Sequence, residues 1–234
     1  MFDYRLDDGV AVLRLDDGKA NALSRETIAA IETALDRAEK EARAVLLLGR
    51  EGRFSAGFDL AVMRSGIEPM RGLVTAGADL LLRIALHPLP ILVGCTGHAL
   101  AAGALLLLAA DFRIGARGEF KIGLNEVAIG MRLPIFGYEL ARERLSKRYL
   151  VRAALQAELF DPEGAVAAGF LDRTCDAAAL AETALAEARR LAALAQPAYS
   201  RTKAGLRGGL VAGIRATLAE DMARLAGPTP PSSR

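Results

Sequence analysis

The fold of this chain is decided by the stretch Thr96-Gly-His-Ala-Leu-Ala-Ala-Gly-Ala-Leu-Leu-Leu-Leu-Ala-Ala-Asp111. It opens with small residues, continues as an uncharged apolar block and ends at Asp111. The preceding residues 91–94, Ile-Leu-Val-Gly, are typical of a short buried strand. A strand that leads through a small-residue turn into a helix presents unpaired backbone N–H groups at the positive end of the helix dipole. The stretch therefore predicts a turn that can hold an anionic oxygen close to the backbone.

A membrane span is the alternative interpretation of this region, because residues 88–110 contain no Asp, Glu, Lys or Arg. The first half of the region, however, contains prolines, glycines, a threonine and His98. Only residues 99–110 are continuously apolar, and that length is more typical of a core helix than of a span. We therefore expect a buried helix.

Composition indicates a globular chain with one large domain, or one domain and a small appendage. Of the 234 residues, 52% are hydrophobic and 25% are charged, and the formal net charge of +2 gives no reason to expect nucleic acid as a partner. Cys95 and Cys175 form neither a disulfide framework nor a metal-binding pattern, so we expect no metal. The N-terminus lacks a basic start followed by an apolar core, so we expect no signal peptide and a cytoplasmic location.

Apolar patterning predicts strands that alternate with helices in the first two thirds of the chain, which indicates an α/β fold with a largely parallel sheet. The last third is expected to be helical, and Asp161-Pro-Glu and Gly169 mark a helix start and end. Residues 63–72 are expected to be irregular, and residues 227–234 a disordered tail. The strands are expected at residues 2–6, 10–15, 44–48, 91–94, 112–116, 119–122 and 171–174. The helices are expected at residues 24–40, 69–86, 134–145, 146–157, 161–169, 177–194, 197–206 and, after Gly208-Gly209, to residue 225.

Two further motifs follow the same logic. Phe54-Ser-Ala-Gly-Phe-Asp-Leu60 contains a second small-residue turn between an apolar strand and a helix. Ile122-Gly-Leu-Asn-Glu-Val-Ala-Ile-Gly130 places Asn125 and Glu126 in an otherwise apolar run. Each motif alone is compatible with an ordinary loop or a surface acid.

Together, the three motifs resemble the crotonase superfamily, the enoyl-CoA hydratase/isomerase group, and Ala20-Asn-Ala-Leu23 resembles its early loop. The resemblance covers residues 1–205. It implies a crotonase-like spiral of ββα units over residues 1–190 and a helical trimerisation region with the tail over residues 191–234. The implied partner is an acyl-CoA thioester substrate, with coenzyme A as part of the substrate and no separate cofactor. A homotrimer or a dimer of trimers is implied, with neither nucleic acid nor membrane as a partner.

The resemblance also implies where the thioester is held. Its carbonyl oxygen is expected between the backbone N–H groups of Phe58 and Ala102, because two fixed donors stabilise the charge of an enolate more than a neutral carbonyl. The remaining residues expected to contact substrate are Ala20, Ser55, Ala56, Gly57, Asp59, Leu60, Gly103 and Asn125. Asp59 is expected to cap the helix that follows it rather than to act as a base. Lys19, Arg53 and Arg64 are either contacts for the coenzyme A phosphates or solvated charges, whereas His98 and Asp111 are expected to be structural.

The type of reaction depends on the acidic residues. Hydratases of the family usually carry two glutamates, whereas here the first position is Leu105 and only Glu126 remains. This pattern resembles the 3,2-trans-enoyl-CoA isomerases, in which one glutamate moves a proton from C2 to C4. An apolar wall raises the proton affinity of such a carboxylate. We therefore expect an isomerase; the alternatives are a hydratase, a hydrolase or another enolate enzyme that uses Glu126 alone, and a non-catalytic acyl-CoA-binding protein.

Overall fold

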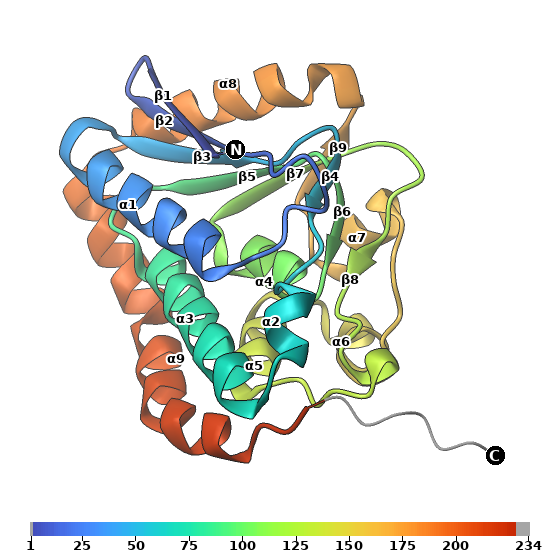
Figure 1. Ribbon diagram of the computed structural model, residues 1–234. Coiled ribbons are helices and arrows are strands. Elements are labelled where there is room, and N and C mark those ends of the chain that lie inside the picture. The colour runs from blue at the N-terminus through green and yellow to red at the C-terminus, as the bar shows by residue number, and fades with distance from the viewer. Residues whose placement is uncertain (1, 228–234) are drawn as a thin grey trace.

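The computed structural model describes residues 2–227, which form two sheets wrapped by helices (Figure 1). The larger sheet has the strand order β1-β2-β3-β5-β7-β9 and is parallel except for the β1–β2 hairpin. The smaller, parallel sheet has the order β4-β6-β8. The larger sheet comprises β1 (Phe2–Asp7), β2 (Val10–Leu15), β3 (Ala44–Leu48), β5 (Ile91–Cys95), β7 (Phe112–Ala116) and β9 (Arg173–Cys175); the smaller comprises β4 (Gly52–Ser55), β6 (Gly97–Leu100) and β8 (Ile122–Gly123).

After the β1–β2 hairpin, the two strands of each successive pair are divided between the two sheets, and helices follow the pairs. In each of the pairs β3–β4, β5–β6 and β7–β8, the first strand enters the larger sheet and the second enters the smaller one. This confirms the predicted α/β spiral of ββα units. The helices are α1 (Arg25–Glu41), α2 (Leu60–Arg64), α3 (Ile67–Leu86), α4 (Ala102–Ala109), α5 (Ile135–Arg144), α6 (Lys147–Ala154), α7 (Pro162–Ala168), α8 (Leu180–Ala192) and α9 (Gln196–Arg224), with short 3₁₀ turns η1 (Val127–Ile129) and η2 (Ala177–Ala179).

Strand β3 shows why the sheet strands are apolar without alternation. Its side chains Ala44, Leu46 and Leu48 pack in the cluster that α8 covers, whereas Val45 and Leu47 face the main core on the other side. In Figure 1, α8 lies over one face of the larger sheet and α1, α3 and α4 lie under the other. Burial on both faces, predicted from the sequence of residues 44–48, is therefore confirmed.

The C-terminal helix α9 corrects one prediction. A break at Gly208-Gly209 was expected, but α9 is continuous from Gln196 to Arg224. Glycine weakens a helix without abolishing it, and burial of Val211 and Ile214 on the inner face of α9 holds the segment. Ion pairs also attach α9 to the core, since Asp111 contacts both Lys203 (2.7 Å) and Arg207 (3.0 Å).

Other differences are local. Residues 63–72, expected to be irregular, mostly belong to α2 and α3, and the segment expected as a strand at 119–122 pairs only at Ile122–Gly123. Strands β4 and β6 were not predicted, because each has only four residues. The predicted C-terminal tail lies, beyond Gly227, outside the described residues. None of the helices between residues 2 and 227 is both long and apolar enough to cross a membrane.

Candidate active site

The site is built where β4 and β6 of the smaller sheet end side by side. Strand β4 leads into Ala56-Gly57-Phe58 and then α2, while β6 leads through Ala101 into α4. The adjacent β8 pairs with β6, and the carbonyl oxygen of Gly123 accepts a hydrogen bond from the N–H of Ala101 (3.0 Å). The smaller sheet therefore brings the turn after β4, the start of α4 and the segment that follows β8 to one edge.

Glycine allows the two turns to approach each other closely. Gly57 has a φ of +89°, and a Cβ added there would lie 3.0 Å from the carbonyl oxygen of Leu100 and 3.2 Å from the amide nitrogen of Ala102. A Cβ at Gly103 would lie 2.3 Å from the carbonyl oxygen of Ser55. A side chain at Gly57 or Gly103 would push the two turns apart. The absence of side chains at these two positions therefore lets the turn after β4 pack directly against the start of α4.

Backbone donors are free at this junction. Within residues 2–227, the N–H groups of Phe58, Ala102 and the adjacent Gly103 donate no hydrogen bond to the protein, whereas that of Ala101 donates to Gly123 (3.0 Å). The N–H of Asp59 donates to Leu23 (3.2 Å), and that of Leu105 donates to Ala101 (3.1 Å). A helix start leaves such N–H groups unpaired, and an anionic oxygen can satisfy them.

The backbone at the start of α4 is strained. Ala101 has φ +51° and ψ −125°, a combination that glycine adopts readily and alanine rarely. Conformations of this kind cost on the order of 1–3 kcal/mol and persist where the surrounding structure imposes them. The bonds from Ala101 to Gly123 and from Leu105 to Ala101 hold the residue on both sides.

Glu126 lines the same cavity as Phe58 and Ala101. The turn η1 fixes its backbone, because the N–H groups of Ile129 and Met131 donate to its carbonyl oxygen at 3.1 and 2.9 Å. Its side chain is only 8% exposed, and its Oε2 atom has no hydrogen-bond partner. Burial raises the pKa of Glu126 from its usual 4.5 to about 7, against a smaller opposing effect of a backbone N–H. The carboxyl group can therefore both take and release a proton near neutral pH.

A cavity of about 360 Å³ opens between these groups. Glu126 is the one acidic residue among the lining residues that belong to the described chain, and Leu105 lines the same cavity. The lining is otherwise predominantly apolar and comes from the two turns, from residues 125–134 after β8, from α2, α3, α4 and α5, and from the end of α9. Its residues are Ala56, Phe58, Leu60, Met63, Arg64, Val74, Leu100, Ala101, Leu105, Asn125, Glu126, Ile129, Met131, Arg132, Pro134, Phe136 and Leu225.

Comparison with known proteins identifies the family. The sequence model of the enoyl-CoA hydratase/isomerase family matches residues 5–223. The chain belongs to this family. A crystal structure of a family protein from Pseudomonas syringae is 47% identical, with a TM-score of 0.94 over 96% of this chain and 98% of that one.

The chain is similar both to proteins named as isomerases and to proteins named as hydratases. Human mitochondrial enoyl-CoA delta isomerase 1 is 32% identical over 205 residues, which cover 85% of this chain and 68% of that protein. The crystal structure of an enoyl-CoA hydratase from Mycobacterium marinum is 35% identical, with a TM-score of 0.91 over 96% of this chain and 99% of that one. Similarity therefore establishes the hydratase/isomerase family and leaves the choice of reaction to the site.

The predicted site residues of this family member fall into two groups. Ala56, Phe58, Leu60, Asn125 and Glu126 line the cavity. The others are not among its lining residues, and their substrate contacts stay predictions; they are Ala20, Ser55, Gly57, Asp59, Ala102 and Gly103.

Three of these other residues have structural bonds. Ser55 is buried, donates to the carbonyl oxygen of Asn21 (2.8 Å) and accepts from the N–H of Gly57 (3.2 Å). The carbonyl oxygen of Ala20 accepts from the N–H of Ala56 (3.0 Å). Asp59 caps α2 by accepting from the N–H of Ala61 (2.7 Å), as predicted for this residue. These bonds fix the shape of the turn that presents the N–H of Phe58.

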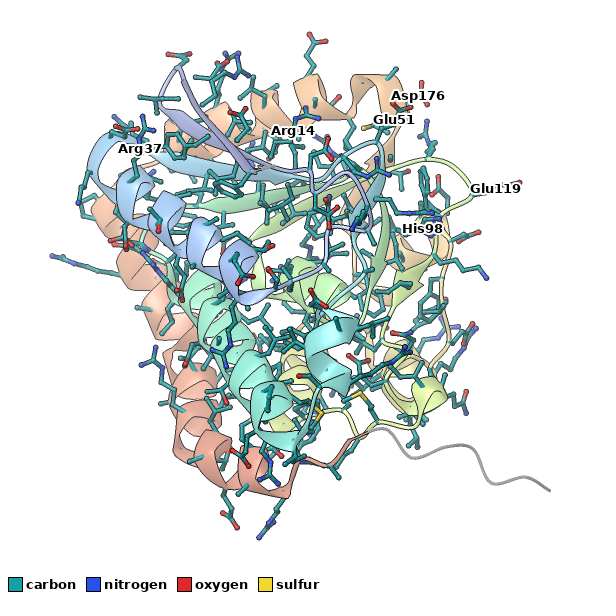
Figure 2. All side chains as sticks on the ribbon, viewed as in Figure 1. Arg14, Arg37, Glu51, His98, Glu119 and Asp176 are labelled. Carbon is teal, nitrogen blue, oxygen red and sulfur yellow. The ribbon has the colours of Figure 1, made fainter. Side chains whose placement is uncertain are left out.

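The charged residues considered as contacts for the coenzyme A phosphates also differ in whether they line the cavity. Arg64 lines the cavity, whereas Lys19 and Arg53 do not. The ring of His98, labelled in Figure 2, lies at the smaller sheet. It packs edge-on against Phe120, with centroids 5.6 Å apart. Asp111 is bound in its ion pairs with α9, so the structural role expected for both residues is confirmed. No group of three His, Cys, Asp or Glu side chains in the described part of the chain is arranged to hold a metal ion.

Several residues that shape the cavity were missed by sequence reasoning. Gly77 of α3 accommodates the ring of Phe58, since a Cβ there would lie 2.2 Å from the Phe58 Cε1 atom. Val74, Phe136 and Leu225 form walls from distant parts of the sequence. The apolar spacing of α3 and α5 shows only that these side chains face inward. It carries no information that they face a cavity.

Proposed function

We propose that this chain is an enoyl-CoA isomerase that moves a double bond between C3 and C2 of an acyl-CoA thioester. The observation that carries the proposal is the single buried carboxylate, Glu126, in an otherwise apolar cavity where Leu105 occupies the place of a second glutamate. The proton transfer needs one base that can hold a proton between two steps. The raised pKa of Glu126 suits both steps.

The reaction begins with the thioester carbonyl oxygen accepting hydrogen bonds from the N–H groups of Phe58 and Ala102. Glu126 removes a proton from C2 of a 3-enoyl thioester, and the electron pair moves towards the carbonyl oxygen. Fixed N–H donors stabilise this developing charge, and loss of one such donor typically costs about 2.7–4 kcal/mol of barrier. Glu126 then returns the proton to C4, so the double bond lies between C2 and C3 and the carboxylate is restored.

Hydration is disfavoured by the same lining. Adding water to C3 needs a water molecule that is held and deprotonated beside the double bond. Leu105 offers no hydrogen bond for that purpose, and the residues around it are predominantly apolar. Isomerisation consumes no water, and exclusion of water protects the enolate from side reactions. Asn125 lines the cavity beside Glu126, and its Oδ1 atom has no partner, which leaves it available to the substrate.

The proposed reaction uses coenzyme A only as part of the substrate and requires no other cofactor. A homotrimer is the proposed assembly, since α9 leaves Leu206 76% exposed and presents several glycines to open space. Light scattering at micromolar concentration measures the mass directly. A monomer mass contradicts the trimer without affecting the proposed reaction.

The test of the activity is incubation with 3-enoyl-CoA and 2-enoyl-CoA of several chain lengths, followed by determination of product mass and double-bond position. We expect interconversion of the two with little 3-hydroxyacyl-CoA. Glu126→Gln should nearly abolish turnover while thioester binding persists, because an amide cannot accept the C2 proton. Efficient hydration of 2-enoyl-CoA with no conversion of 3-enoyl-CoA contradicts the isomerase. Release of free coenzyme A indicates a hydrolase, and binding without turnover indicates a binding protein.

Matched variants separate the two backbone donors from the base. Ala102→Gly keeps the N–H group and should retain activity, whereas Ala102→Pro removes it and should abolish turnover. Leu105→Glu should introduce weak hydration, at a cost in stability if the new acid is buried without a partner. Full activity of a folded Ala102→Pro variant contradicts the assignment of the oxyanion hole.

A further inference from the structure

The C-terminal end of α9 forms part of the cavity. Leu225 follows the last helical residue, Arg224, and its side chain is only 1% exposed. It lines the cavity together with Val74 of α3 and Phe136 of α5. In Figure 1, α9 runs along α3 and ends beside the base of α3, remote in sequence from the turns that carry the free N–H groups. Leu225 therefore adds an apolar wall that no other part of α9 supplies.

Arg71 of α3 holds this wall in place. Its Nε and Nη2 atoms donate to the carbonyl oxygen of Leu225 at 3.2 and 3.1 Å, and Nη2 also donates to that of Ala223 at 2.5 Å. The last carbonyl groups of a helix lack partners within the helix, and the Arg71 guanidinium supplies hydrogen bonds to them. Its positive charge is also stabilised by the negative end of the helix dipole. Arg71 thus fixes the backbone from which the Leu225 side chain projects.

A second contact joins the same end of α9 to Arg132 and to the start of α5. Asp221 is buried, and its Oδ1 atom accepts a hydrogen bond from Arg132 Nη2 (2.6 Å). Its Oδ2 atom accepts from the N–H of Ile135 (2.7 Å), the first residue of α5. Arg132 and Phe136 both line the cavity. One carboxylate therefore ties α9 to two segments of the cavity wall.

We infer that Leu225, clamped by Arg71 and Asp221, is the residue that limits the length of the acyl chain this enzyme accepts. The inference rests on the proposed function, in that the cavity holds the acyl group of a thioester. Methylene groups between the thioester and Leu225 are buried against apolar walls, and each increases affinity about fourfold. A chain that reaches Leu225 must displace a side chain whose backbone is held by several hydrogen bonds, so further methylenes add no affinity.

The test measures binding of saturated acyl-CoA thioesters, from butanoyl to dodecanoyl, by titration calorimetry. These ligands do not react by double-bond migration, so binding is independent of turnover. For the wild type, we expect affinity to increase about fourfold per methylene up to a limiting length and then to level off or fall. Leu225→Ala should move this limit to longer chains by at least about one two-carbon step. Leu155→Ala is the matched control, since the same substitution is made at a 66% exposed position that does not line the cavity.

A second variant tests the clamp without changing the wall itself. Arg71→Ala leaves Leu225 in the chain but removes the bonds to its backbone, so we expect the length limit to weaken or disappear. If thioesters bind but Leu225→Ala and Arg71→Ala reproduce the wild-type length profile, the inference is wrong and the proposed isomerase is unaffected. If the length profile shifts as expected but 3-enoyl-CoA is not converted, the proposed isomerase activity is wrong, whereas the role of Leu225 in limiting chain length is supported. Absence of any thioester binding overturns both.

Discussion

Replacing Glu126 with glutamine should make the protein more stable at alkaline pH while it removes activity. Glu126 is 8% exposed, and one of its oxygens has no hydrogen-bond partner. Burial raises its pKa from 4.5 to about 7. Its ionised form therefore destabilises the native state, because the buried charge is not compensated. Glutamine has almost the same shape and carries no charge, so it should remove this cost.

The pKa of Glu126 in the two states gives the sign and size of the effect. Between pH 4.5 and about 7, the native state keeps the proton that the unfolded state has lost, so stability falls as pH rises through this window. One pKa unit corresponds to about 1.4 kcal/mol, so ionisation costs the native state about 3 kcal/mol once the pH exceeds 7. The advantage of the glutamine variant over the wild type should be about 2–3 kcal/mol larger at pH 8 than at pH 5.

Urea unfolding, followed by circular dichroism at pH 5, 6, 7 and 8 and a fixed protein concentration, measures this difference. The control is Glu119→Gln, which changes the same side chain on an exposed loop where Glu119 projects away from the ribbon (Figure 2). Its stability should follow that of the wild type at every pH. If the wild type and Glu126→Gln depend on pH to the same extent, Glu126 is not buried as a perturbed acid. The reasoning on its role as base then fails as well.

Three further predictions concern the same site and its support. The kcat/KM for 3-enoyl-CoA should decrease tenfold per pH unit below about 7 and level off above it, because Glu126 must be ionised to accept a proton; a rate independent of pH between 5 and 8 contradicts this. Gly77→Ala should lower the free energy of unfolding by about 1–3 kcal/mol through contact with Phe58. Adding Phe58→Ala should cost less than the sum of the single changes, and strictly additive urea-unfolding energies rule out the contact. Asp111→Asn should cost about 3–5 kcal/mol, since it leaves two buried cations of α9 uncompensated, and an unchanged thermal midpoint contradicts that role.

Local sequence signals determined most of the larger sheet and its helices. Residues 44–48 are apolar on both faces, so their burial between two layers followed from composition alone. Asp161 and Gly169 marked a helix start and end through capping chemistry, and the structure has both caps on α7. These features depend on residues that are close in sequence, which is why periodicity and capping rules detect them. The amino-acid sequences of the three motifs then indicated the family and Glu126 as the base.

Only the tertiary structure decided how the site is closed. Strands β4 and β6 are too short for periodicity to reveal, yet they bring the N–H groups of Phe58 and Ala102 to the same edge. The raised pKa of Glu126 depends on the walls around it, and Leu225 reaches the cavity from nearly a hundred positions further along the chain. Local patterns state that a side chain is buried. Which distant backbone or side chain it meets is set by packing, and packing exists only once the chain has folded.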